Sequence, residues 1–326
     1  MSATGTPTSS LAQFGRAWKL TVNTVPDETG IQQQITAFSS AWIPEALHIT
    51  FETFQSVNSA LWYADISIYN LNNATLNTII TQGMTVSLEA GYMNKPYGVI
   101  FEGTVFQPLW ERENVTDFKL TLHCVVGFIN NGNNFAAQSF AKGLTQRQLV
   151  ARMAAGASTP VPLVTNPDAD TALSKTTLSR GGIIFGNPDK YFEQASKYSD
   201  LNTWQSNAQA SIISLSKSAN LPTFTFGVGS GLLGTPQQTQ FGVDCRVLLD
   251  PRITPATQIY LDQSALTVRQ LPLGLAGNTY PTILSQSGYY AVLAVRHMGD
   301  SRGNTWETQI TGSLYSDELL EALQSW

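Results

Sequence analysis

The sequence predicts a mainly β protein with antiparallel sheets and a small α+β insertion. Apolar and polar residues alternate in two early runs, 47–54 and 64–70, as they do in strands with one buried face. Similar runs follow at 86–90, 97–109 and 118–126. No helix follows each strand, as a parallel sheet would require, so we expect antiparallel β-barrels or sandwiches.

The first β domain is expected over residues 1–127. Residues 1–10 are rich in Ser and Thr and lack an apolar core, so we expect a flexible arm there and no signal peptide. The opening strand is predicted at Trp18–Asn23, and a turn at Asp27–Gly30 leads into a second strand over 31–38.

One short helix is predicted among these strands. Leu76, Ile79 and Ile80 fall at helical spacing after Asn72 and Asn73, either of which can cap the first amides. Gly83 can take the left-handed position that closes the helix.

The insertion is expected over 128–220. A capping box at Thr145–Gln148 opens a helix that runs to about Ala155. Asn187 followed by Pro188 starts a second helix that ends near Tyr198. Residues 203–215 predict a hairpin, and 158–167, with three prolines, an extended crossing.

A second β domain is expected over 221–312, followed by a helical tail at 313–326. Its strands are predicted at 243–249, 258–261, 266–270, 289–298 and 305–312. In the tail, Ser316 can cap a helix whose first turn carries acids. Its Leu residues suit either a docking tail or one that folds back on its own domain.

Composition limits the classes of function. Charged residues make up 13% of the 326 residues, and Lys and Arg number 18 against 23 Asp and Glu, with no basic run. Tight binding to nucleic-acid phosphates is therefore disfavoured. No window approaches the ~18 apolar residues of a membrane span, so no membrane anchor is expected. Cys124 and Cys245 look inward from apolar strands, which predicts buried free thiols.

Motifs for chemistry are weak. The three histidines are dispersed, and His123 and Cys124 point to opposite faces of one strand, so no metal site is expected. Gly229–Gly234 matches a dinucleotide fingerprint, but 235–239 predicts a loop where that site needs a helix, so no cofactor is expected. The acids cluster around a predicted hairpin, which favours a solvated rim and no enzyme: Glu102, Glu111, Glu113 and Asp117.

The most distinctive local run is a predicted hairpin at 296–306, in whose Gly-Asp-Ser-Arg-Gly-Asn turn the glycines permit positive backbone angles and the Asp can bond nearby amides. Together with 66–71, 231–243 and 248–255, this run resembles the baseplate hub proteins of contractile-tailed bacteriophages, the tail-tube-like hub family.

The resemblance implies two tail-tube-like antiparallel β-barrels with smaller inserted domains. It further implies a homotrimer whose six barrels stack on a sixfold tail tube and present threefold symmetry to a central spike. The expected partners are the tail tube protein, the central spike protein and other baseplate proteins. DNA would pass through during ejection without specific binding. The protein would be made in the host cytoplasm and lie in the virion.

Three segments are interface candidates under this hypothesis: the short helix, the 300–304 hairpin and the C-terminal tail. The candidate residues are Asn73, Leu76, Asn77, Gln82, Asp300, Arg302, Asn304, Asp317, Glu318 and Trp326. Two other functions remain open. One is a carbohydrate-binding β-sandwich module, which exposed Trp, Tyr, Asn and Gln would permit. The other is a peptidoglycan hydrolase that uses Glu102 or Glu111.

Overall fold

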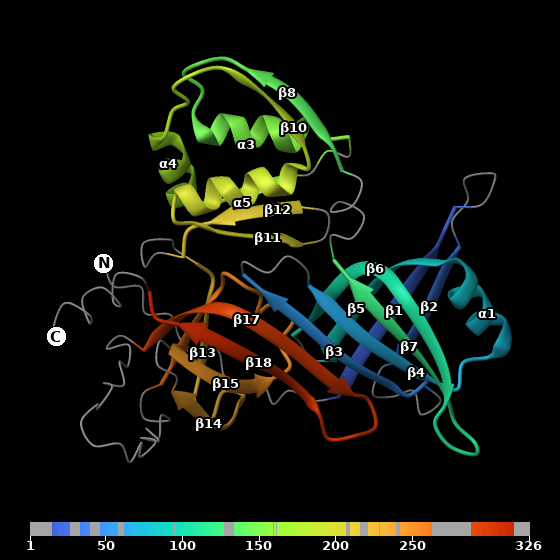
Figure 1. The fold of residues 1–326 in the computed structure, drawn as a ribbon. Helices are drawn as coiled ribbons and strands as arrows, with labels where there is room; N and C mark the ends of the chain where they lie inside the picture. Colours follow the sequence, from blue (N-terminus) through green and yellow to red (C-terminus); the bar gives the residue numbers. More distant parts are fainter. Residues whose placement is uncertain are drawn as a thin grey trace, which may run out of the picture.

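The structure is a computed structural model (Figure 1). It describes residues 15–26, 33–39, 46–57, 62–93, 96–126, 134–158, 160, 162–206, 209–215, 221–227, 229–238, 242–262 and 288–315. The predicted turn at 27–30, the strand at 266–270 and the tail from 316 onward, with Asp317, Glu318 and Trp326, lie outside these residues.

Strands dominate the described chain, as predicted. The helices are α1 (Asn73–Gln82), α3 (Gln146–Ala155), α4 (Pro167–Lys175) and α5 (Pro188–Tyr198). The strands are β1 (Arg16–Thr24), β2 (Gln34–Ser39), β3 (Ile49–Ser56), β4 (Tyr63–Tyr69), β5 (Gly83–Tyr92), β6 (Tyr97–Arg112), β7 (Phe118–Val125), β8 (Ala136–Phe140), β9 (Leu163–Thr165), β10 (Gly182–Gly186), β11 (Asn202–Ser206), β12 (Gln209–Ile213), β13 (Thr223–Phe226), β14 (Leu232–Gln238), β15 (Gly242–Leu248), β16 (Gln258–Leu261), β17 (Tyr289–Asp300) and β18 (Trp306–Ser313).

One large sheet joins the two predicted β domains. Its order is β14-β15-β18-β17-β3-β4-β7-β6-β5-β1-β2, with β13 and β16 attached beside β17. The join is the antiparallel pair β3 and β17, which matches seven residue pairs from Ala294–Ser56 to Asp300–Thr50. The described strands thus form one open sheet, and the two separate tail-tube-like β-barrels expected from the sequence are not seen among them.

Two apolar cores lie under this single sheet. The first gathers buried side chains of β1 and β3–β7, such as Trp18, Ile66 and Leu122. The second gathers those of β15–β18, such as Val247, Ile259 and Ile310. Each run of the sheet therefore curls over a core of its own, consistent with two similar β units.

Helix α1 covers one end of the first core with Leu76 and Ile79. Asn72 is its cap, because its side chain accepts a hydrogen bond from the Thr75 amide at 2.8 Å. The left-handed geometry expected of Gly83 is wrong, because its φ of −62° and ψ of 124° are extended. Glycine is required there for space instead, since a Cβ would lie 2.6 Å from the Ile79 carbonyl oxygen.

The insertion forms three layers above the large sheet (Figure 1): the β8–β10 ribbon, the helices, and the sheet β11-β12-β9. The capping box at Thr145 and Gln148 is confirmed, as is the Asn187 cap of α5. The extended crossing predicted over 158–167 is only partly right, because it holds β9 and leads into α4. Asn166 caps α4 by accepting from the Ala169 amide at 3.0 Å, and Pro167 is its first residue.

Candidate assembly surfaces

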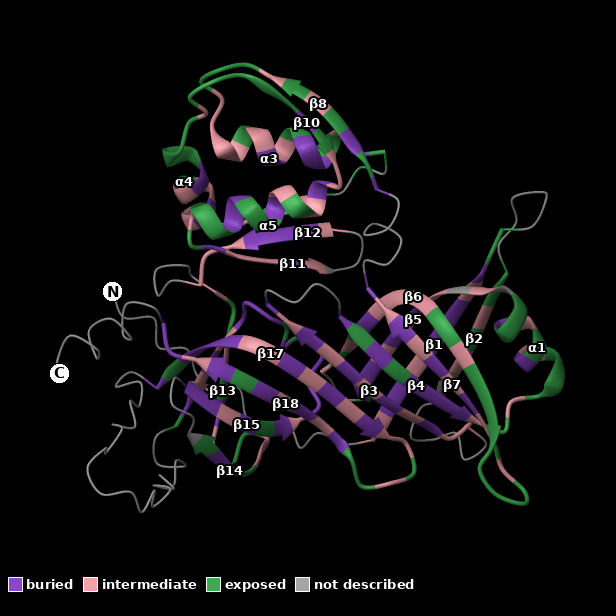
Figure 2. Ribbon diagram, viewed as in Figure 1, coloured by how far each residue is buried: buried purple, intermediate pink, exposed green. Residues whose placement is uncertain are grey.

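One face of the large sheet is polar and the other is apolar. Burial alternates along the strands, as Figure 2 shows for β3 and β4. Antiparallel pairing aligns the polar positions into rows that cross several strands. One row runs through Arg246, Gln309, Arg296 and Phe54; the next runs through Glu307, Met298, Glu52, Asp65 and His123. We call this surface the polar face.

Acidic side chains lie beside the two arginines and the histidine of these rows. Arg296 lies 3.2 Å from Glu52, and Arg246 lies 3.8 Å from Glu307. His123 Nδ1 lies 2.5 Å from Asp65 Oδ1. Across the two rows each arginine therefore has an acid beside it, and the polar face does not offer a free positive charge there.

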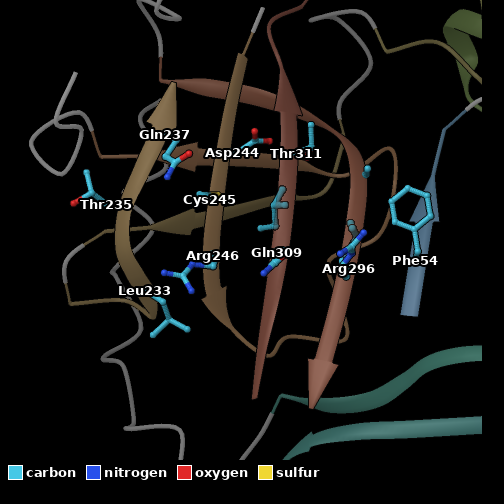
Figure 3. Close-up of a pocket in the computed structure, with 13 residues that line it drawn as sticks. Phe54, Leu233, Thr235, Gln237, Asp244, Cys245, Arg246, Arg296, Gln309 and Thr311 are labelled. Atoms are coloured by element: carbon cyan, nitrogen blue, oxygen red, sulfur yellow. The ribbon is translucent and has the colours of Figure 1, made fainter. Parts of the chain in front are cut away.

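A shallow hollow of about 410 Å³ indents the polar face over β14, β15, β18 and β17 (Figure 3). In Figure 3, Arg246, Gln309 and Arg296 follow one another across three strands, and Asp244 and Thr311 lie in the neighbouring row. The lining mixes amide, hydroxyl and paired charged groups, which suits transient contact with a polar polymer more than tight binding of a small apolar ligand.

The predicted 300–304 hairpin is held to the sheet by side chains that are distant in the sequence. Arg16 donates from Nη1 to the Asp300 carbonyl oxygen at 2.9 Å and from Nη2 to the Asn304 carbonyl oxygen at 3.1 Å. His48 Nε2 lies 2.8 Å from Asp300 Oδ1, and the same oxygen accepts from the amides of Arg302 and Gly303 at 2.9 and 2.7 Å. The hairpin is thus a rigid corner.

The contacts of this corner favour the ionised form of Asp300. Burial would raise the pKa of its carboxyl, but the Arg302 and Gly303 amides and His48 outweigh burial and hold the pKa below its ordinary value. Arg302 in turn donates to the Ala46 carbonyl oxygen at 3.2 Å. Both side chains, proposed as interface residues, therefore have internal structural roles.

The candidates on α1 divide by face. Leu76 is buried with 7% of its surface exposed, so it supports the helix from inside the first core. Asn73 and Asn77 are exposed on the outer side together with Ile80, which keeps 38% of its surface. Gln82 is the last helical residue. The outer face of α1 is therefore amide-rich with one apolar residue.

The hairpin of β6 and β7 carries apolar side chains past the end of the core. Trp110 and Phe118 follow the core positions Leu120 and Leu122 on the same face, yet 52% of Trp110 and 38% of Phe118 remain exposed. Their rings stack with centroids 5.5 Å apart. No described strand pairs with the second edge of β6 beyond Thr104. We call residues 105–118 the β6–β7 overhang.

The β6–β7 overhang was not among the sites predicted from the sequence. Its signal was present: Val105 and Phe106 are adjacent apolar residues, as are Leu109 and Trp110, and a strand with apolar residues on both faces is either buried or covered by a partner. The length of β6, 16 residues, also exceeds that of the strands beside it.

The acids proposed for a hydrolase do not form a catalytic pair. Glu102 and Glu111 lie on the same strand nine residues apart, which separates them by about 30 Å at 3.3 Å per residue, against the 5–10 Å of glycosidase carboxylates. Glu111 pairs with Lys119 at 3.4 Å. Hydrogen bonds from Asn70 and Asn114 lower the pKa of Asp117, whereas a general acid needs a raised one.

Other sequence predictions have clear outcomes. Cys124 and Cys245 are buried free thiols, as predicted, and burial raises both thiol pKa values. Gly231 leads directly into β14, so the dinucleotide fingerprint lacks its helix, and the loop predicted at 235–239 is wrong through residue 238. Four of the five described tryptophans are buried, which leaves Trp110 alone among them as a platform for sugars.

Among the residues that the structure describes, no group of three His, Cys, Asp or Glu residues is placed to hold a metal ion. No helix in that part of the chain is long and apolar enough to cross a membrane.

Comparison with known proteins shows similarity in structure only. No family model matches the sequence, and no curated protein matches it. A 43 kDa tail protein of prophage MuSo2 from Shewanella oneidensis superimposes with a TM-score of 0.54 and 9% identity over 94% of this chain and 99% of that one. A tail protein of Neisseria meningitidis gives 0.52 and 8% over 92% and 97%.

A third structure is an Escherichia coli component of the type VI secretion system, described as similar to the T4 bacteriophage tail proteins gp27 and gp5. It gives a TM-score of 0.51 and 9% identity over 85% of this chain and 76% of that one. The resemblance to phage baseplate proteins is thereby confirmed at the level of the fold, which this chain shares with these tail and secretion-system structures.

Proposed function

We propose that the chain is a structural protein of a phage-type baseplate, the hub that joins a tail tube to a central spike. The observation that carries the proposal is the shared fold, which spans 92–94% of this chain and 97–99% of two tail proteins. Because a fold does not by itself fix a function, the surfaces described above must also suit the role.

Ring closure accounts for the free edges of the large sheet. The strand order ends at β14 and β2, and the second half of β6 has one unpaired edge among the described strands. Exposed edges and the apolar β6–β7 overhang favour aggregation unless neighbouring copies cover them. Closed cyclic assembly covers them all equally. Three copies with two β units each would make a ring of six, as the sequence resemblance implies.

The polar face suits the wall of a DNA conduit. DNA slides where phosphates find no clustered free cations, and the rows of the polar face pair Arg246 and Arg296 with acids. The chain as a whole carries a formal charge of −5. The conduit would therefore repel the polymer weakly and hold it nowhere.

The proposed contacts with the tube and the spike use the candidates named from the sequence. Asn73, Asn77 and Gln82 on α1 remain proposed contact residues, with Leu76 as internal support. The corner formed by Asp300, Arg302 and Asn304 would present a rigid edge to a neighbour. The tail residues Asp317, Glu318 and Trp326 stay sequence-based proposals.

Mass in solution tests the ring. Native mass spectrometry of the purified chain should show three times the 35.4 kDa chain mass, and electron microscopy should show rings with a central hole. Replacement of Phe106 and Trp110 by Ser should shift the population toward monomer, because the β6–β7 overhang loses its apolar contacts. Tyr198→Ser, which removes an aromatic residue from α5 that is even more exposed, 72% against 58% for Phe106 and 52% for Trp110, is the control and should leave the trimer intact.

A particle that stays strictly monomeric at concentrations well above those of an assembled virion would count decisively against the hub proposal. Trimers that form equally well in the Phe106→Ser, Trp110→Ser variant would keep the ring but remove the β6–β7 overhang from its interface.

A further inference from the structure

The β8–β10 ribbon at the top of the insertion exposes apolar side chains that the ring proposal does not use. Ile184 of β10 points inward and is 7% exposed, whereas its neighbours Ile183 and Phe185 are 79% and 72% exposed. Phe135 packs edge-on against Phe185 with ring centroids 4.3 Å apart. Figure 2 shows the ribbon as the outermost layer of the insertion. The outer face of the ribbon thus carries the aliphatic and aromatic residues Ile183, Phe185 and Phe135 beside the small residues Ala137 and Ser139 of β8.

The outer edge of β10 is also unpaired. The ribbon has two strands, and β8 takes all of the strand pairing that β10 makes in the described chain. The apolar residues are flanked by Gly181, Gly182 and Gly186, so β10 has no charged side chain that would prevent another strand from pairing with this edge. Proteins commonly protect such edges with Lys, Pro or bulges. An unprotected edge beside apolar side chains favours the addition of another strand.

Positive charge gathers at one end of the ribbon. Lys142 and Arg180 are exposed where the two strands turn away, and a Cβ on Gly181 would lie 3.4 Å from the Lys142 amide nitrogen. The sequence contains no Asp or Glu in 118–167 or in 171–188. Residues 134–215 carry seven Lys and Arg against five Asp and Glu, whereas the whole chain is negative. The ribbon therefore lies in a positively charged region of a protein whose net charge is negative.

We propose that the ribbon binds an extended segment of another protein, in which apolar residues alternate with Asp or Glu. The segment adds as a strand to the free edge of β10. Its apolar side chains cover Ile183 and Phe185, and its acids approach Lys142 and Arg180.

A polypeptide fits this site better than other polymers do. The free edge offers alternating amide and carbonyl groups at the strand repeat, and only another peptide backbone matches that pattern. Nucleic acid would need more clustered cations than Lys142 and Arg180 supply. The alternation of apolar and acidic residues follows because successive side chains of an added strand point to opposite faces.

Peptide binding to the full chain tests the proposal. The probe is a fluorescein-labelled eight-residue peptide of alternating valine and glutamate, followed by fluorescence anisotropy. We expect saturable binding at least about tenfold tighter than that of the matched valine–lysine peptide. An N-methylated valine–glutamate peptide, which keeps the side chains but loses the ladder donors, should also bind at least about tenfold more weakly.

Variants assign the binding to the ribbon. Ile183→Thr with Phe185→Thr should weaken binding at least about tenfold while the fold persists, because both residues are exposed and threonine suits strands. Tyr198→Thr, with the same 72% exposure on α5, is the control. Lys142→Glu with Arg180→Glu should reverse the preference toward the valine–lysine peptide. Lys190→Glu with Lys197→Glu makes the same charge change on α5 and should leave the preference for the valine–glutamate peptide in place.

Several results would overturn the proposal. Equal binding of the acidic and basic peptides would remove the charge argument, and equal binding of the N-methylated peptide would remove strand addition. Binding to anionic lipid vesicles that is lost in the Ile183→Thr, Phe185→Thr variant would assign the face to a membrane. Self-association lost in the same variant would assign it to a second copy. The ribbon assay reads neither ring formation nor DNA passage, so it can fail while the hub proposal stands.

Discussion

The polar face of the large sheet and the outer face of the β8–β10 ribbon are both exposed β surfaces, but their chemistry is opposite. On the polar face, Arg296 and Arg246 each stand beside a glutamate, and the strands carry mostly polar side chains. On the ribbon, the side chains of Ile183 and Phe185 are largely exposed to solvent. The nearby cations have no acidic neighbours in sequence. The difference teaches that the arginines of one surface are paired with acids, as the proposed conduit wall requires, whereas the other surface keeps the features of a binding site.

The largest expected effect tests whether the ribbon has one buried and one exposed face. Ile184→Ala should lower the free energy of unfolding of the insertion by about 2–4 kcal/mol, because Ile184 lies in its core. Ile183→Ala should change it by less than about 0.5 kcal/mol, because Ile183 is 79% exposed. Chemical denaturation followed by tryptophan fluorescence measures both. Equal losses would mean that both faces are buried and would end the contrast with the polar face.

The second prediction concerns the buried side of the large sheet. His297 is fully buried next to a hollow of about 370 Å³ between the sheet and the insertion, and its Nδ1 lies 2.9 Å from Thr308 Oγ1. Burial lowers the pKa of His297 to about 4, with a small opposing influence from Asp250.

The unfolded chain binds a proton at His297 near pH 6.5, whereas the folded chain does so only near pH 4. This contribution to stability is therefore complete above pH 6.5 and is lost as the pH falls toward 4. The loss amounts to about 3 kcal/mol. In the His297→Asn variant, the free energy of unfolding should depend less on pH between pH 6.5 and pH 4. Denaturation curves measured at several pH values test this. An unchanged slope would show that the imidazole reaches water and that this side of the sheet is not sealed.

The third prediction tests the neutral polar face. Glu52→Gln with Glu307→Gln leaves Arg296 and Arg246 without their acids. The variant should bind double-stranded DNA at low salt. The slope of its log affinity against log salt should be steeper than that of the unchanged chain by up to about 2. Glu113→Gln with Glu193→Gln, which changes the net charge equally at other places, should not. Equal retention by the two variants would show that only total charge matters and that pairing on the polar face does not.

The smallest effect is expected for a single pair on that face. Arg296 and Glu52 each expose about 40% of their side chains, so Arg296→Gln should lower the free energy of unfolding by less than about 1 kcal/mol. A loss of several kcal/mol in the isolated chain would mean that the polar face is desolvated, and the comparison with the ribbon would need to be reversed.

Local signals in the sequence predict most elements of this fold. The Asn72 cap, the Thr145 capping box and the Asn187-Pro188 start each specify a helix within a few residues, because they act on amides at the very end of that helix. Alternation predicts the long strands in the same way, since it repeats over seven or more residues.

Long-range pairing could not be predicted in this way. The seam between β3 and β17 joins residues more than 230 positions apart, and neither strand indicates its partner, so two separate barrels were expected where one sheet is found. The short strands β8, β9 and β10 have three to five residues each, too few for a periodic pattern. The ribbon site was missed for that reason, although the acid-free stretches 118–167 and 171–188 were visible in the sequence.

The seam between β3 and β17 has a mechanical consequence. Its seven residue pairs lie side by side along antiparallel strands. A pull along the strand direction loads all of their hydrogen bonds at once, whereas a pull across the strands opens them one after another. The molecule should therefore transmit axial force from one β unit to the other far better than it resists peeling of the two strands.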